Sequence, residues 1–180
     1  MTAPRLSTNQ IFQSAWVVAD FEAAAEQWAS LYGVGPFYVM DFESGPELRY
    51  RGQPGVLQMQ VAWAQAGDVQ VELINPVSTE PNVYRDLVPA GETRFHHVCY
   101  WSRDYDQDLA AMNAAGFVTA MASGPANARF AYFDTSAVNG HMIEILEVDP
   151  GIQGLFAKVS YAAREWDGSR LLRPFAELFG

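Results

Sequence analysis

The sequence contains one cysteine and one lysine, and each scarcity excludes a class of protein. Cys99 has no second cysteine with which to form an internal disulfide, so we expect a reducing compartment, most simply the cytoplasm. Lys158 is the single lysine, and 11 basic residues against 21 acidic ones give a formal charge of −10. Because nucleic-acid binding needs clustered Lys and Arg side chains, this balance argues against a nucleic-acid partner.

Long apolar runs are lacking as well. No stretch approaches the roughly 18 apolar residues that cross a membrane, and no apolar core of a secretory signal follows Arg5. We therefore expect no membrane partner. Hydrophobic residues still make up 49% of the 180 residues and charged residues 18%, a balance typical of a globular protein with a real core.

Two segments of the sequence share the same order of features. The first runs from Ile11 to Gly33 and the second from Phe95 to Gly116. Each begins with a β-branched and aromatic run typical of a strand, continues with apolar residues at helical spacing, and ends at a glycine suited to a helix C-terminus. Asp20 and Asp104 stand before the two expected helices, where their carboxylates can cap the first turn.

Three strand-like segments separated by turn residues follow each expected helix. They are residues 36–42, 57–64 and 69–74 in the first copy and 117–121, 129–133 and 142–146 in the second. We predict an α+β fold in which two tandem βαβββ modules, residues 9–78 and 93–149, form a cup-shaped mixed sheet. Residues 150–180 are expected to form a C-terminal helix and an apolar tail. The tail packs on the modules or against a second subunit, which makes a homodimer reasonable.

Four polar residues fall at equivalent places in the two copies. Gln13 and His97 lie in the first strand of each copy, each seven residues before its capping aspartate. Glu72 and Glu144 lie in the matching last strands, VQVELINP and HMIEILEVDP. Since alternate residues of a strand share a face, three of the four project among mostly apolar neighbours, and Glu72 projects from a more mixed face.

Facing carboxylates in an apolar interior are costly unless a positive charge lies between them. No lysine or arginine occupies a matching strand position, whereas a divalent cation would neutralise both Glu72 and Glu144. With Gln13 and His97 as neutral ligands, three oxygen donors and one imidazole fit a six-coordinate site with positions open to water or substrate. Zn²⁺, Ni²⁺, Co²⁺, Fe²⁺ and Mn²⁺ all suit this set.

The other candidates for chemistry have simpler interpretations. His96, His141 and Glu147 are expected to point to the opposite face from the four positions. Cys99 lacks a base in register with it and is interpreted as a small core residue.

The paired βαβββ pattern, together with the strings FHHVCY, VQVELI and GHMIEIL, resembles the vicinal oxygen chelate superfamily. This superfamily includes glyoxalase I, methylmalonyl-CoA epimerase, extradiol dioxygenases and bleomycin-resistance proteins. The resemblance implies metal ligands at Gln13, Glu72, His97 and Glu144, a set similar to that of glyoxalase I. Epimerases more often have His and Gln at the first two positions, and extradiol dioxygenases require a histidine where Gln13 stands.

The resemblance implies a metal-dependent isomerase, epimerase or lyase that acts on a small substrate with vicinal oxygens through an enolate-type intermediate. It makes Glu144 the first candidate for the catalytic base and Glu72 the second. Abundant aromatic residues favour a bulky, apolar substrate. Val17 replaces the arginine with which glyoxalase I holds glutathione, which leaves Arg49 and Arg51 as candidates to hold an anion. A metal-free protein that binds a hydrophobic ligand or drug, and a ring-cleaving dioxygenase, are the alternatives.

Overall fold

The computed structural model describes residues 5–124 and 128–180 as an α+β fold built on one curled sheet. The first repeat supplies β1 (Ile11–Val17), α1 (Phe21–Tyr32), β2 (Phe37–Glu43), β5 (Gln58–Ala66) and β6 (Val69–Pro76). The second supplies β7 (Arg94–Ser102), α3 (Tyr105–Ala114), β8 (Thr119–Ala122), β9 (Phe130–Phe133) and β10 (Met142–Glu147). The remaining elements are β3 (Arg49–Tyr50), β4 (Gln53–Pro54), α2 (Val83–Leu87), α4 (Ser136–Asn139), α5 (Pro150–Arg164), β11 (Leu172–Pro174) and the 3-10 helix η1 (Phe175–Phe179).

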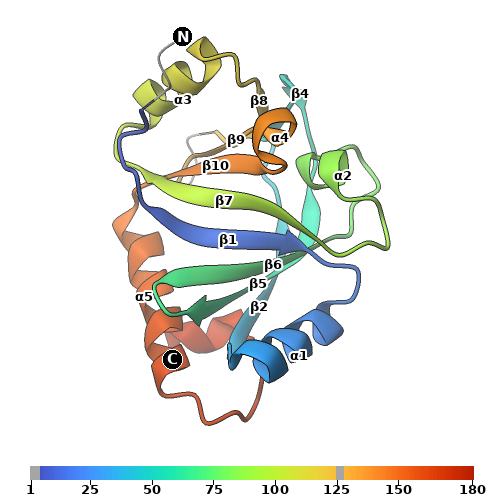
Figure 1. The fold of residues 1–180 in the computed structure, drawn as a ribbon, viewed down its shortest axis with the longest axis vertical. Coiled ribbons are helices and arrows are strands. Elements are labelled where there is room, and N and C mark those ends of the chain that lie inside the picture. Colours follow the sequence, from blue (N-terminus) through green and yellow to red (C-terminus); the bar gives the residue numbers. More distant parts are fainter. Residues whose placement is uncertain (1–4, 125–127) are drawn as a thin grey trace.

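The strand order of the sheet shows the repeat directly. It runs β11-β2-β5-β6-β1-β7-β10-β9-β8-β3-β4, so the first copy reads β2-β5-β6-β1 and the second mirrors it as β7-β10-β9-β8. The copies meet where β1 and β7 pair antiparallel, and each of these strands pairs in parallel with the last strand of its own copy. In Figure 1 these two strands cross the middle of the molecule, with α1 and α3 at opposite ends. The predicted cup-shaped fold is confirmed.

The helices begin and end where the sequence signals place them. Asp20 accepts a hydrogen bond from Ala23 N at the start of α1, and Asp104 accepts one from Gln107 N at the start of α3. Gly33 caps α1 in the left-handed region, with φ 66°, which a residue without a Cβ adopts without strain. Local capping chemistry therefore sets these boundaries.

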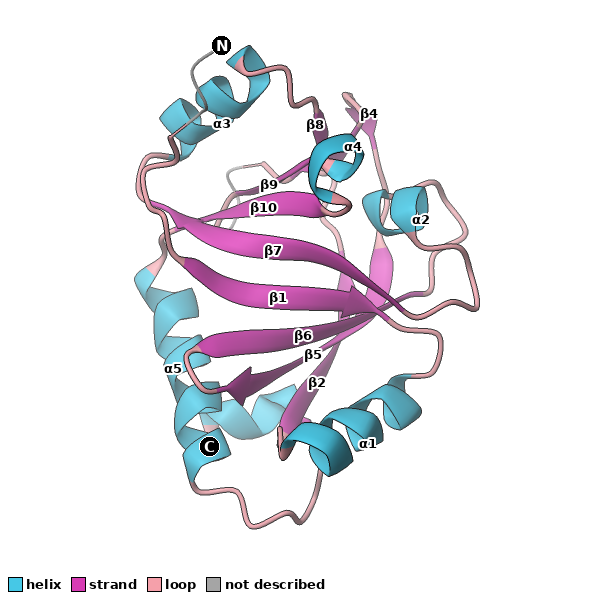
Figure 2. Ribbon diagram, in the orientation of Figure 1, coloured by secondary structure: helices cyan, strands magenta, loops and turns pink. Residues whose placement is uncertain are grey.

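The core lies on both faces of the curled sheet. Ala15, Val61 and Met142 belong to the cluster inside the cup, which α5 covers with Leu155 and Phe156. On the outside, separate apolar clusters lie under α1 and under α3. Figure 2 shows the helices arranged around the strands in this way.

A short hairpin joins the two edges of the cup. The sequence predicts only a turn between β2 and β5, but β3 in this segment pairs with β8 at the far edge of the second copy. Arg51 N also donates to Ala120 O at 2.7 Å. Arg51 and Gly52 adopt left-handed φ values of 46° and 80° as the chain turns back. This long-range pairing has no local sequence signature, which is why the pattern did not reveal it.

The C-terminal tail packs on the first repeat. β11 adds to the sheet in parallel beside β2, with Leu172 opposite Phe37. Lys158 Nζ on α5 donates to the carbonyl oxygen of Leu178 at 2.6 Å, which ties the tail to the helix. Packing on the modules, the first of the two expected arrangements of the tail, is thus the one observed within the chain.

No helix in the described ranges, 5–124 and 128–180, has the length and apolar character to cross a membrane.

Candidate metal centre and cavity

A cavity of about 480 Å³ opens on the inside of the cup. Its acidic and amide side chains are of two kinds: Gln13, Glu72 and Glu144 are almost fully buried, whereas Glu43 and Glu47 are exposed to solvent. Most of the remaining wall is apolar. It includes Met40, Phe42, Leu48, Leu57, Met59, Val61, Trp63, Tyr84, Phe130, Tyr132, Leu146, Ile152 and Phe156.

Three of the predicted ligands meet beside this cavity: Glu72 and Glu144 line it, and the buried His97 side chain contacts both of them. His97 Nε2 lies 3.0 Å from Glu144 Oε2 and 3.5 Å from Glu72 Oε2. Strand pairing causes this convergence, because Ala15 of β1 lies opposite both Glu72 of β6 and His97 of β7. Glu144 comes from β10, the strand on the other side of β7. The pairing of the two repeats therefore brings residues that are far apart in the sequence next to one another.

Neighbouring polar side chains hold Glu72 and Gln13 in place. Trp63 Nε1 donates to Glu72 Oε1 at 2.8 Å, and Gln13 Nε2 donates to Gln70 Oε1 at 2.6 Å. The indole donor fixes the Glu72 carboxylate. The Gln70 contact engages the amide nitrogen of Gln13, so its amide oxygen is the atom that Gln13 has left for a cation.

Burial and charge together decide the protonation of this cluster. Burial alone lowers the pKa of His97, but the adjacent carboxylates of Glu144 and Glu72 outweigh burial and raise the pKa to about 9. Burial raises the pKa of Glu72, although His97 and Trp63 oppose the rise. Without a bound cation, a protonated His97 therefore supplies the positive charge between the two carboxylates.

The donor set fits a divalent cation in its chemistry. His97 Nε2 is fully buried and has no partner in hydrogen-bond geometry, even though Glu144 Oε2 lies 3.0 Å away. Such an orphaned nitrogen beside two carboxylates is a ligand set that Zn²⁺ and related ions accept. The side chains nevertheless contact each other directly, and among the residues described no three His, Cys, Asp or Glu side chains form a ready-made metal-binding group. Cation binding would require them to move apart.

His96 is placed differently from the prediction. It was expected to point away from His97, but both rings are fully buried and their Nδ1 atoms lie 2.9 Å apart. The cause is a β-bulge: β1 residues Ala15 and Trp16 pair with His97 and Phe95, so His96 is an extra residue without a partner. The prediction assumed strict alternation along the strand, which a bulge interrupts.

The candidate anion-binding arginines lie outside the cavity wall. Arg51 Nη2 contacts Asp86 Oδ2 at 2.8 Å, and Arg49 Nη1 donates to the carbonyl oxygens of Pro46 and Leu48. Within the described ranges, no Lys, Arg or His side chain lines the cavity, whereas four carboxylates do. The electrostatic character of the wall is therefore acidic.

The remaining candidates from the sequence are His141, Glu147 and Cys99, and none of them has a reactive role in this cluster. His141 Nδ1 faces the carbonyl oxygen of Met142 at 2.7 Å, and Glu147 pairs with Arg129 at 2.6 Å. Burial raises the pKa of the Cys99 thiol, and repulsion from Glu144 adds to the rise. Cys99 is therefore held as a neutral thiol, as a core residue would be.

The cup-shaped sheet is made of two βαβββ copies, and polar residues from the first and last strands of the copies converge inside it. A family model described as Glyoxalase/Bleomycin resistance protein/Dioxygenase superfamily matches residues 12–133. The chain belongs to this superfamily. Among curated proteins, none matches the sequence.

Solved structures share the fold at low sequence identity. Methylmalonyl-CoA epimerase from Mycobacterium tuberculosis superposes with a TM-score of 0.54 at 18% identity, over 85% of this chain and 96% of the other. A hypothetical protein from Bacillus halodurans C-125 gives 0.55 at 15% identity, over 78% and 94%. A methylmalonyl-CoA epimerase in complex with methylmalonyl-CoA and NH4+ gives 0.51 at 17% identity, over 78% and 95%. At these identities the likeness is one of fold.

Proposed function

We propose that this protein is a metal-dependent isomerase, epimerase or lyase that acts on a bulky, apolar substrate with two adjacent oxygens. The observation that carries the proposal is the buried cluster in which His97 Nε2 lies between the carboxylates of Glu144 and Glu72, at 3.0 and 3.5 Å. Gln13 lines the same cavity. Epimerases among the structures of the same fold support an isomerase role in this superfamily.

The four residues would divide the work between holding a cation and moving a proton. Gln13, Glu72, His97 and Glu144 would hold one divalent ion, and that ion would act as a Lewis acid that stabilises negative charge on a substrate oxygen. Glu72 is fixed by the Trp63 indole, which suits a residue that holds its position. Glu144 lines the cavity without such an indole donor, and it would take a proton from the substrate carbon and return it.

The cavity wall limits the substrate by charge and shape. The aromatic and methionine side chains would bury a flat apolar body, and exclusion of water there would strengthen each electrostatic contact with it. The bound ion would neutralise Glu72 and Glu144, but Glu43 and Glu47 line the same cavity, and no Lys or Arg side chain lines its described wall to attract an anion. A neutral aromatic hydroxyketone therefore fits the wall better than an anionic thioester or glutathione adduct.

Racemisation of (R)-benzoin, a neutral aromatic compound with adjacent oxygens, tests the proposal. We expect the cation-loaded protein to exchange the C–H proton of the benzoin carbinol carbon with solvent deuterium. The Glu144→Gln variant should lose this activity. Mandelate is the matched anionic probe and should react far more slowly. Exchange by Glu144→Gln at the wild-type rate would remove Glu144 from the mechanism.

A metal-free protein that binds a hydrophobic ligand is the second candidate, favoured by the apolar wall and by the direct contacts of His97 with both carboxylates. Such a protein would bind benzoin equally well in chelator and in added metal, without exchange of its proton. Binding that depends on the metal would exclude this candidate.

A further inference from the structure

His96 stands behind His97 in a line of contacts that leads from the cavity to the protein surface. Its Nδ1 lies 2.9 Å from His97 Nδ1, and its Nε2 lies 3.1 Å from the carbonyl oxygen of Val83 on α2. Both histidines are fully buried, with the rings of Tyr84 and Tyr132 beside that of His96. The His96 ring is thus held at both of its nitrogens.

The Val83 carbonyl determines which ring nitrogens of His96 and His97 carry a proton, here called the proton order. A carbonyl oxygen only accepts, so His96 Nε2 must carry a proton and donate it. One proton then lies between the two Nδ1 atoms. If His96 carried it, this ring would be a buried cation beside the rings of Tyr84 and Tyr132, and its polar partners among the described residues are His97 and the Val83 carbonyl, neither of them a carboxylate. Because an unpaired buried charge is costly, the proton belongs to His97.

This proton order has a consequence at the cavity. With Nδ1 protonated, the neutral form of His97 has its lone pair on Nε2, the nitrogen that faces Glu144 and Glu72. We propose that His96 is a positioning residue that fixes His97 in the Nδ1–H tautomer and so presents Nε2 as a metal ligand. The effect on metal binding rests on the proposed function, whereas the proton order of His96 does not.

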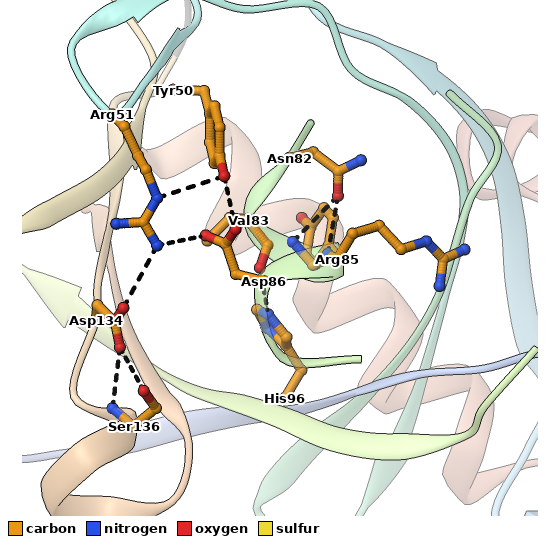
Figure 3. Close-up of polar contacts among 10 residues, drawn as sticks. Tyr50, Arg51, Asn82, Val83, Arg85, Asp86, His96, Asp134 and Ser136 are labelled. Carbon is orange, nitrogen blue, oxygen red and sulfur yellow. Dashed lines mark hydrogen bonds and ion pairs between the residues drawn. The ribbon is translucent and has the colours of Figure 1, made fainter. Parts of the chain in front are cut away.

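Surface contacts hold the far end of the line in place (Figure 3). Asn82 caps α2 by accepting hydrogen bonds from the backbone nitrogens of Tyr84 and Arg85. Asp86 of the same helix accepts from the Tyr50 hydroxyl at 2.6 Å and pairs with Arg51 at 2.8 Å. The hairpin that joins the two edges of the cup therefore also anchors the helix whose carbonyl orients His96.

The proton order is measured directly by long-range ¹H–¹⁵N NMR of the wild-type protein with ¹⁵N-labelled histidine, free of metal. We expect a neutral His96 ring with Nε2 protonated and Nδ1 bare. In the zinc-loaded protein, we expect His97 with Nδ1 protonated. A protonated Nδ1 on His96 would overturn the proposal, even if the protein binds metal and turns over substrate.

Two substitutions separate positioning from packing. His96→Asn keeps an acceptor oxygen near the place of Nδ1, whereas His96→Leu fills the site without any acceptor. We expect zinc affinity, measured by calorimetry, to fall roughly 10- to 100-fold in the leucine variant and to recover in the asparagine variant. Circular dichroism checks that both fold. Equal loss in both variants, or wild-type affinity in the leucine variant, would overturn the proposal, and the NMR measurement decides it should the leucine variant not fold.

Discussion

Raising the pH is expected to tighten metal binding, because a proton and the cation compete for His97 Nε2. The two carboxylates raise the pKa of His97 to about 9 against the lowering effect of burial, so the ring holds its proton at neutral pH. A group with a raised pKa must lose this proton before its nitrogen can ligate a metal ion. Affinity therefore rises with pH up to about 9 and levels off above it.

The size of this effect follows from the distance between the working pH and the pKa. Each pH unit below a pKa costs a factor of about 10 in affinity for one competing proton, or about 1.4 kcal/mol. With the pKa near 9, affinity at pH 7 is expected to be about 100-fold weaker than its limit, and to improve about tenfold between pH 6 and 7.

Calorimetric titration with Zn²⁺ or Co²⁺ measures both parts of this prediction. Repeating it at pH 6, 6.5 and 7 gives the slope, and buffers of different ionisation enthalpy give the number of protons released. We expect about one proton per metal ion, with any excess at the lower pH assigned to Glu72, whose pKa burial also raises. An affinity independent of pH, with no proton released, would refute the proposed charge balance.

Three further substitutions test separate contacts. Trp63→Phe removes the indole donor of Glu72 and is expected to weaken metal affinity roughly 10-fold while leaving the fold intact, by calorimetry and circular dichroism; unchanged affinity would deny Trp63 a role in orientation. Glu144→Gln should abolish benzoin proton exchange, as read by deuterium incorporation. Arg51→Ala breaks a half-exposed ion pair with Asp86 and should lower the free energy of unfolding by about 1 kcal/mol or less, by urea denaturation. A loss of several kcal/mol would mean that the hairpin depends on this pair far more than its exposure suggests.

The repeat made much of the fold readable from the sequence, because local rules operate in each copy. Asp20 and Asp104 cap their helices as expected, and the predicted strands pair in mirrored order. The crossing of β3 to β8 was not foreseen, since it depends on the curvature of the whole sheet.

The positions of the candidate site residues could be predicted from the sequence wherever side chains alternate regularly along a strand. This alternation brought Glu72, His97 and Glu144 together, but it assigned His96 to the wrong direction because the bulge in β7 breaks the alternation. The adjacent pair His96-His97 was the one signal in the sequence, and nothing local showed that both rings would be buried in contact. Nothing in the sequence distinguishes Trp63 from the other aromatic residues, because its hydrogen bond to Glu72 depends on the pairing of β5 with β6.

Elemental analysis of protein purified without chelator tests the central claim most directly. The proposed site at Gln13, Glu72, His97 and Glu144 predicts about one divalent metal ion per chain, or uptake of one on titration, and loss of that ion in His97→Ala. A protein that carries no metal and takes up none on titration would contradict the proposed metal-dependent chemistry.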